Sequence, residues 1–212
     1  MPDTRTTGRP RLCGVPVTAG ADEPGGASRA APPPGEWRTA GCEFSRSPQV
    51  VTMAGTAMPV TPPALAAVMA HIDEAGRGRH ADSYAGLEVD QWTVRAVVHR
   101  VPSAEFDEVI RAAAGDTCVV VRDAAHSLAE LSRWQSRIAA DLDGWTAQGV
   151  RISTVGARHD GAGVQVGTED VDRARRELPA RYGPDAPLIF VEEGPVTPIP
   201  PAGPSEGLQR RG

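Results

Sequence analysis

The strongest constraint on the fold of this chain is a run of apolar residues at helical spacing between Ser127 and Gly149. Its members are Leu128, Leu131, Trp134, Ile138, Leu142 and Trp145. Steps of three and four residues place these side chains on one helix face. Ser127 and Glu130 have the spacing of a capping box, and Gly149 can adopt the left-handed conformation that ends a helix. The pattern predicts one connecting helix over residues 127–149, in which Gly144 weakens the last turn.

Two similar segments flank this helix. In the first, alternating residues in Tyr84–Val89 and Val94–Val101 predict two strands, and Ser103 caps a helix. The β-branched run Thr117–Val121 then predicts a buried strand. The order of elements is therefore strand, strand, helix, strand.

The same order recurs after the connecting helix. Residues 150–154 and 164–166 alternate, and Asp160-Gly161 between them is a strong hairpin signal. A helix capped by Thr168 or Asp170 follows, and residues 188–191 form the last apolar run. The sequence thus predicts an α+β fold with a duplicated ββαβ unit, the second copy covering residues 150–193.

The two ends of the chain lack the regular apolar pattern of the segments between them. Residues 1–60 show no sustained period and are rich in Gly, Pro and Arg, so we expect disorder there. A second interpretation is that Met53 is the true start of the protein. A short amphipathic helix opens at Pro62-Pro63, which gives a first folded unit over residues 62–126. The Pro- and Gly-rich tail over residues 194–212 is also expected to be disordered.

This order of elements resembles the pro-region of secreted bacterial serine proteases of the streptogrisin and α-lytic protease group. The stretches that carry the resemblance are Tyr84–Asp90, His126–Leu131, Gly149–Val155 and Gly163–Gly167. The resemblance implies two small α/β units that act as a folding chaperone and tight inhibitor of the protease that follows them. In those pro-regions the sheet of the C-terminal unit engages the protease. Because no protease domain follows Gly212, we expect a stand-alone binding role.

Composition narrows the choice of partner and compartment. All 22 basic residues are Arg, and residues 60–198 hold 21 acidic residues against 14 Arg. This acidic body would repel a phosphate backbone, so we expect no nucleic-acid partner. No apolar run has the length of a membrane span, and the N-terminus lacks the order of a secretory signal, so we expect a cytoplasmic protein. Cys13, Cys42 and Cys118 suggest no disulfide framework, and Cys118 reads as a small buried apolar residue.

Candidate catalytic and ligand-binding residues each have a simpler interpretation. His159-Asp160 could form half of a catalytic pair, but Asp160-Gly161 is explained as a turn. Ser127 is explained as a helix cap, and no nucleophile elbow surrounds any serine. Glu192-Glu193 could hold a hard cation, although paired acids at a strand end are commonly solvated. The glycines between residues 161 and 167 lie in a hairpin and not in a phosphate loop. We therefore expect no catalytic residue, metal or cofactor.

The remaining candidates are for protein binding. The last predicted strand, consisting of Leu188, Ile189, Phe190 and Val191, could pair with another chain if it lies at a sheet edge. Trp92 lies at a predicted hairpin tip, where an exposed aromatic could anchor a partner. The leading hypothesis is a non-enzymatic protein-binding module similar to a detached pro-region. The alternatives are an intracellular structural or adaptor domain and, third, a small-molecule enzyme with a site between the repeats.

Overall fold

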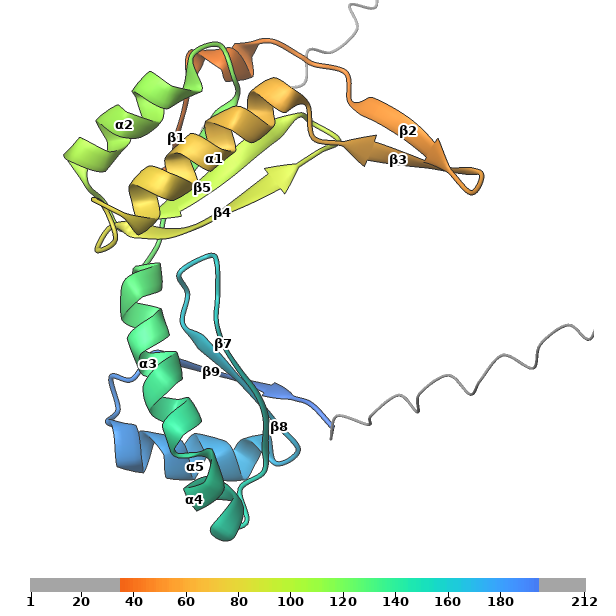
Figure 1. Ribbon diagram of the computed structural model, residues 1–212. Helices are drawn as coiled ribbons and strands as arrows, with labels where there is room; N and C mark the ends of the chain where they lie inside the picture. The colour runs from red at the N-terminus through yellow and green to blue at the C-terminus, as the bar shows by residue number, and fades with distance from the viewer. Residues whose placement is uncertain (1–34, 195–212) are drawn as a thin grey trace, which may run out of the picture. The chain divides into compact units, whose positions relative to one another are not determined.

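The computed structural model describes residues 35–194, which form the α+β fold that the sequence predicts (Figure 1). The helices are α1 (Pro63–Arg77), α2 (Ala104–Ala114), α3 (Leu128–Ala140), α4 (Leu142–Ala147) and α5 (Val171–Tyr182), and a short 3-10 helix, η1, covers Ala40–Glu43. The strands are β1 (Trp37–Arg38), β2 (Gln49–Met53), β3 (Thr56–Val60), β4 (Tyr84–Asp90), β5 (Arg95–Arg100), β6 (Val119–Asp123), β7 (Ile152–Ala157), β8 (Val164–Thr168) and β9 (Leu188–Glu192). No helix among the described residues is both long and apolar enough to cross a membrane.

Four strands form the first sheet, in the order β1-β6-β5-β4. Strands β4 and β5 are antiparallel, whereas β5 and β6 are parallel and are connected through α2. Helices α1 and α2 lie over the sheet, and Leu65, Ile72, Phe106 and Ile110 from these helices are buried against it (Figure 1). This packing explains the amphipathic spacing of both helices in the sequence.

Three strands form the second sheet, in the order β7-β8-β9. Strands β7 and β8 are antiparallel, β8 and β9 are parallel, and α5 connects β8 to β9. Helices α3, α4 and α5 contribute the buried side chains that pack with β8: Leu131, Ile138, Trp145, Ala174, Leu178 and Tyr182. The two segments therefore share one order of elements and one pattern of strand pairing. Their origin by duplication stays a prediction.

The connecting helix is broken, so the expectation of one helix over residues 127–149 is wrong in its second half. Helix α3 ends at Ala140 and α4 begins at Leu142, with Asp141 between them at φ −100° and ψ 2°. The Arg181 guanidinium and the Tyr182 hydroxyl, both from α5, each donate to Asp141 Oδ2 over 2.9 Å. These contacts come from residues about 40 positions away in the sequence. The spacing of apolar residues along the helix therefore gives no sign of the break.

The apolar face of the connecting segment is nevertheless used as predicted. Leu131, Ile138 and Trp145 are buried in the second core, and Trp134 packs against it. Leu128, at the start of α3, packs instead against the first core. The Ser127 hydroxyl accepts a hydrogen bond from the Glu130 amide over 3.1 Å, which confirms the predicted cap.

The expectation of disorder over residues 1–60 is wrong for residues 35–60. Strand β1 adds to the first sheet by pairing with β6, and the Thr39 hydroxyl donates to the Thr117 carbonyl over 2.7 Å. Strands β2 and β3 form a separate hairpin. The earlier residues of this segment, 1–34, lie outside the described part of the chain, as do residues 195–212 of the predicted tail. The interpretation of Met53 as the start stays a prediction.

The cysteines also depart from expectation, because Cys42 and Cys118 form a disulfide. Strand β1 lies beside β6, and η1 brings Cys42 next to the residue that precedes β6. The two cysteines are 76 positions apart, so no local spacing pattern reveals the pair. The third, Cys13, lies outside the described residues.

Candidate protein-binding surface

The candidate strand Leu188–Val191 lies at a sheet edge. Strand β9 (Leu188–Glu192) pairs with β8 on one side and, among the described residues, with no strand on the other. Two bonds at its ends fix its orientation: the Val164 amide donates to the Pro187 carbonyl over 2.7 Å, and the Glu193 amide donates to the Thr168 carbonyl over 3.0 Å. Because backbone groups alternate along a strand, the odd-numbered residues face β8. Phe190 and Glu192 therefore turn their backbone groups toward the open edge.

Side chains of β9 alternate between the two faces of the sheet. Leu188 and Phe190 pack against the second core, together with Val166 of β8. Ile189 and Val191 lie on the opposite face, beside Gln165 and Gly167 of β8. The four predicted binding residues thus divide into two that hold the core and two that a partner could contact.

Two glycines lie on the face of the sheet that carries Ile189 and Val191. Gly156 on β7 and Gly167 on β8 contribute no side chain to it. A Cβ at Gly167 would overlap the Glu193 carboxylate and the Thr154 hydroxyl, so this glycine allows a close approach. The Glu193 and Thr154 side chains therefore occupy the space over Gly167, beside the two apolar side chains.

The Glu193 carboxylate is anchored on this face, whereas Glu192 is exposed. The Thr154 hydroxyl donates to Glu193 Oε2 over 2.6 Å, and the side-chain amide Nε2 of Gln165 donates to Oε1 over 3.5 Å. No group of three or more His, Cys, Asp or Glu residues suited to a metal ion occurs between residues 35 and 194. Glu193 therefore acts here as a hydrogen-bond acceptor that holds the chain after β9.

Trp92, the other predicted contact, lies at the β4–β5 tip of the first sheet with 61% of its surface exposed. The Asp90 carboxylate holds the tip, since its Oδ1 accepts bonds from the amides of Trp92 and Thr93, each over 3.1 Å. A hydrogen bond from the Thr93 side chain is the largest cause that lowers the pKa of Asp90, and the two amide bonds lower it further. Val94 is buried at a φ of 52° and ends the turn. The structure thus places Trp92 and β9 on different sheets and does not bring them together.

The pair His159-Asp160 does not form a catalytic dyad. Asp160 bonds Arg158, whose guanidinium holds the pKa of Asp160 at about 2, below its usual range. The Asp160 carboxylate also accepts a bond from the Ala162 amide, as expected for a turn. His159 lies instead 3.4 Å from a carboxylate oxygen of Glu88, whose other oxygen is 3.4 Å from His99. The turn interpretation of Asp160 is confirmed.

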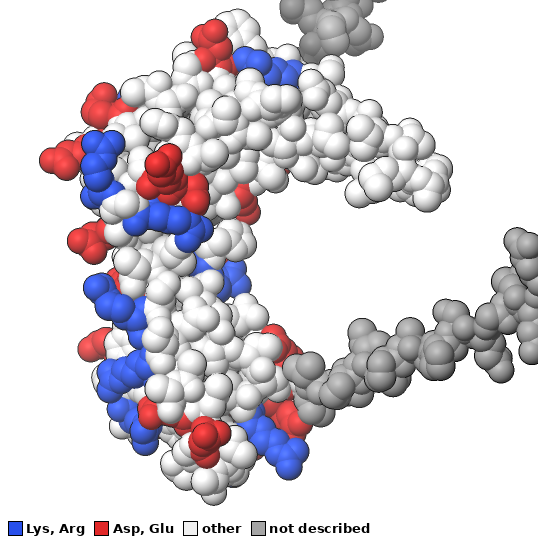
Figure 2. All heavy atoms as spheres, viewed as in Figure 1, with Lys and Arg blue, Asp and Glu red and all other residues white. Residues whose placement is uncertain are grey.

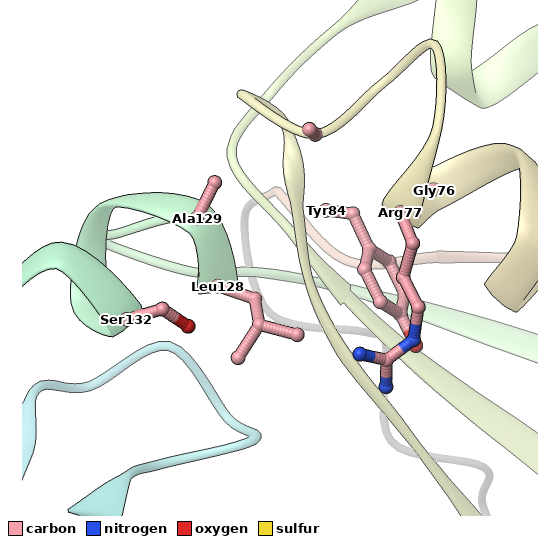
Figure 3. A pocket seen from close by; sticks show the side chains of 7 residues that line it. Gly76, Arg77, Tyr84, Leu128, Ala129 and Ser132 are labelled. Carbon is pink, nitrogen blue, oxygen red and sulfur yellow. The ribbon is translucent and has the colours of Figure 1, made fainter. Parts of the chain in front are cut away.

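A small pocket lies among α1, β4 and the start of α3 (Figure 3). Arg77, Tyr84, Leu128 and Ser132 are among its lining residues, and its volume is about 210 Å³. The Tyr84 hydroxyl donates to Asp73 over 2.6 Å, and burial raises the pKa of Tyr84. The Arg77 guanidinium also donates to Asp73, over 2.7 Å, so the polar groups that α1 and β4 place at the pocket are already paired with this carboxylate.

The exposed hairpin formed by β2 and β3 was not predicted from the sequence. Most of the large apolar side chains that the described chain exposes lie in it or just before it: Phe44, Val50, Val51, Met53 and Met58. The available signal was the alternation around Ala54-Gly55, a pair that suits a two-residue turn. High Gly and Pro content in the preceding residues obscured that signal.

Comparison with known proteins adds no relative to this description. No family model matches the chain, and neither does a curated protein or a solved structure.

Proposed function

We propose that this chain is a non-enzymatic protein-binding module that receives an extended segment of its partner along β9. The observation that carries the proposal is the open edge of β9, where the backbone groups of Phe190 and Glu192 have no strand partner among the described residues. An extended peptide that adds to such an edge gains main-chain hydrogen bonds. Pro195 and Pro198, which follow the strand, would limit how far the added strand extends.

The face of the sheet next to this edge suits contact with side chains of the added segment. Ile189 and Val191 supply apolar surface, and the Glu193 and Thr154 side chains fill the space over Gly167 beside them. The Glu193 carboxylate, held by Thr154 and Gln165, places a fixed negative charge at the end of the strand. These features favour a partner segment with apolar residues at alternate positions and a basic or neutral residue near Glu193.

The sequence resemblance to protease pro-regions gives the partner class to test first, a serine protease of the streptogrisin type. In those pro-regions the C-terminal sheet engages the protease, and the resemblance implies that β9 is the corresponding strand in this chain. Inhibition of such a protease is a consequence to be measured and forms no part of the proposal.

The enzyme alternative has less support from the described residues. The pocket at Arg77 and Ser132 has a volume of about 210 Å³, and the pocket beside it, at Leu87 and His159, has about 340 Å³. The first lies below and the second at the low end of the roughly 300–1,000 Å³ typical of ligand pockets. An adaptor role without a protease partner shares the β9 surface and differs only in the partner. The open edge therefore supports both binding hypotheses, and identification of the partner separates them.

The disulfide bears on the compartment in which the chain acts. Disulfides persist in oxidising environments and are rare in the cytosol. The Cys42–Cys118 bond thus weighs against the cytoplasmic location that the sequence predicts. An oxidising compartment also agrees with the secreted proteases that the sequence resembles.

A proline placed on the open edge tests the proposal. Glu192 is exposed and its amide faces away from β8, so Glu192→Pro should remove one outward donor and leave the β8–β9 bonds intact. Glu192→Ala is the matched control, because it changes the same side chain and keeps the amide. We expect Glu192→Pro to bind a streptogrisin-type protease about tenfold more weakly than Glu192→Ala. Equal affinity of the two folded variants would refute binding along β9.

A further inference from the structure

The hairpin arm, defined as β2, β3 and their turn (residues 49–60), has little packing of its own. Its strands pair with each other and with no further strand among residues 35–194. Val50, Val51, Met53 and Met58 in the arm are exposed by between 41% and 62%. A two-stranded ribbon by itself is marginally stable in water, so an arm of this kind gains stability when a further strand is added.

The arm is also uncharged. No Asp, Glu, Lys or Arg occurs between Arg46 and Asp73, and Figure 2 shows the arm without red or blue atoms on the face drawn. The whole chain carries a formal net charge of −5. Two copies of the chain therefore repel each other through their bodies, but a contact between arms adds no like-charge repulsion.

The register of the arm determines which backbone groups face outward. Ala54 and Gly55 have φ angles of 49° and 81°, as in the two-residue turn that suits a twisted hairpin. Such a turn is closed by a hydrogen-bonded pair, here Met53 and Thr56, and bonded and non-bonded pairs alternate from it. The pairs Thr52–Ala57 and Val50–Pro59 are then non-bonded, so their backbone groups face away from the hairpin.

Because of this alternation, the two outer edges of the arm differ in the backbone hydrogen-bonding groups that they offer to a further strand. On β3 one of the outward residues is Pro59, which has no amide hydrogen to donate. On β2 the outward residues are Val50 and Thr52, which keep both donor and acceptor. The edge of β2 contains no proline or charged residue, the two features that commonly block an edge strand. Strand addition is therefore blocked at β3 and open at β2.

We propose that β2 pairs antiparallel with β2 of a second copy of this chain, about a two-fold axis at Val51. In that register Val50 of one copy lies opposite Thr52 of the other, and each pair exchanges two hydrogen bonds. The same edge serves both copies, as a two-fold interface requires. The two hairpins then form one four-stranded sheet, in which Val51 of each copy are direct neighbours.

The side chains on one face of this sheet reinforce the pairing. Val51, Met53 and Met58 lie on the same face of the arm, because they alternate with Val50, Thr52 and Ala57. In the paired arms these three side chains and their copies form one apolar stripe across the axis. Strands of five residues bury far less than the roughly 1,200 Å² of a standard interface, so the dimer is weak and depends on concentration.

Cross-linking at the axis tests the geometry. Val51→Cys, in the full chain with Cys13→Ser, should form a covalent dimer under mild oxidation, because facing residues of a non-bonded pair have Cα atoms about 4.5 Å apart. Ala57→Cys in the same background is the control, since it lies on β3 away from the axis. We expect at least about tenfold faster dimer formation from Val51→Cys than from Ala57→Cys. Equal rates would overturn the assignment of the axis.

Sedimentation velocity over a concentration series tests the association without any cysteine. Val50→Pro removes an outward donor from each copy, whereas Val50→Ala keeps it, and neither changes a bond inside the hairpin. We expect wild type and Val50→Ala to dimerise at high concentration and Val50→Pro to dimerise about tenfold more weakly. A wild-type chain that stays monomeric throughout the series overturns the proposal. The proposal is also overturned if Val50→Pro dimerises as strongly as Val50→Ala and the wild type. Neither result affects the β9 proposal.

Discussion

Arg100 is a charged side chain in an almost fully buried position, with 5% of its surface exposed. Its guanidinium bonds Asp107 on α2 over 2.7 Å and also bonds Asp123 at the end of β6. Hydrogen bonds to the two carboxylates raise the pKa of Arg100 despite the opposing effect of burial. One residue thus connects β5 with the helix and the strand that follow it.

Replacement of Arg100 should therefore be costly. We expect Arg100→Met to lower the free energy of unfolding by about 3–5 kcal/mol, because it leaves two carboxylates without their partner. The control is Arg122→Met, since Arg122 is 44% exposed and its ion pair with Glu36 should contribute at most about 1 kcal/mol. Urea denaturation of both variants is the measurement. A similar small loss in each would contradict the assigned role of Arg100.

Asp160 makes the stability of the chain sensitive to acid. Arg158 lowers the folded-state pKa of Asp160 to about 2, below the value of roughly 3.9 in an unfolded chain. A lowered pKa contributes stability that is present above the unfolded value and is lost as the pH falls through the folded value. We expect Asp160→Asn to remove part of the loss of stability between about pH 4 and pH 2. The thermal midpoint of both proteins against pH measures this, and parallel curves would show that Asp160 contributes nothing.

At the scale of elements, the connecting segment stabilises the second unit. Leu131 and Ile138 are fully buried, so Leu131→Ala and Ile138→Ala should each cost about 2–5 kcal/mol. Ser127→Ala should cost about 1 kcal/mol through the lost cap. Arg133→Ala, on the exposed face of α3, is the matched control and should change stability by at most about 0.5 kcal/mol. Equal small effects at all four positions, measured by urea denaturation, would mean that α3 does not support the core.

The disulfide is the second stabilising link at this scale. Cys42→Ser together with Cys118→Ser should lower the free energy of unfolding by about 2–4 kcal/mol, because the open chain has more freedom when unfolded. The same loss should appear when the wild type is unfolded in a thiol reductant, and the double variant should not respond to the reductant. An identical midpoint for oxidised and reduced wild type would contradict a structural role for this bond.

Elements with a local signal could be predicted from the sequence, and those held by distant contacts could not. Helices α1, α2 and α5 and strands β4 to β9 lie close to their predicted positions, because apolar periodicity and capping residues are local. The break at Asp141 depends on Arg181 and Tyr182, and the position of β1 depends on β6. Pairing of Cys42 with Cys118 likewise depends on the folded arrangement.

At the scale of the whole molecule, only part of the candidate protein-binding surface could be predicted from the sequence. The sequence indicates that residues 188–191 form a strand, and the structure places that strand at an edge. Which residues turn inward could not be predicted without the pairing, so Phe190 was expected at the interface although it packs in the core. The β2–β3 arm was not predicted, because the Gly and Pro content before it obscured the alternation around Ala54-Gly55, and the exposure of its apolar side chains is a property of the folded chain.

Hydrogen exchange of individual backbone amides tests the central claim most directly. The full chain would be measured alone and with a saturating amount of a streptogrisin-type protease whose nucleophile has been replaced. If the partner adds a strand to β9, the outward amides of Phe190 and Glu192 should become protected, while those of Ile189 and Val191, already bonded to β8, should change little. Unchanged exchange at Phe190 and Glu192 in the saturated sample would contradict binding along this edge.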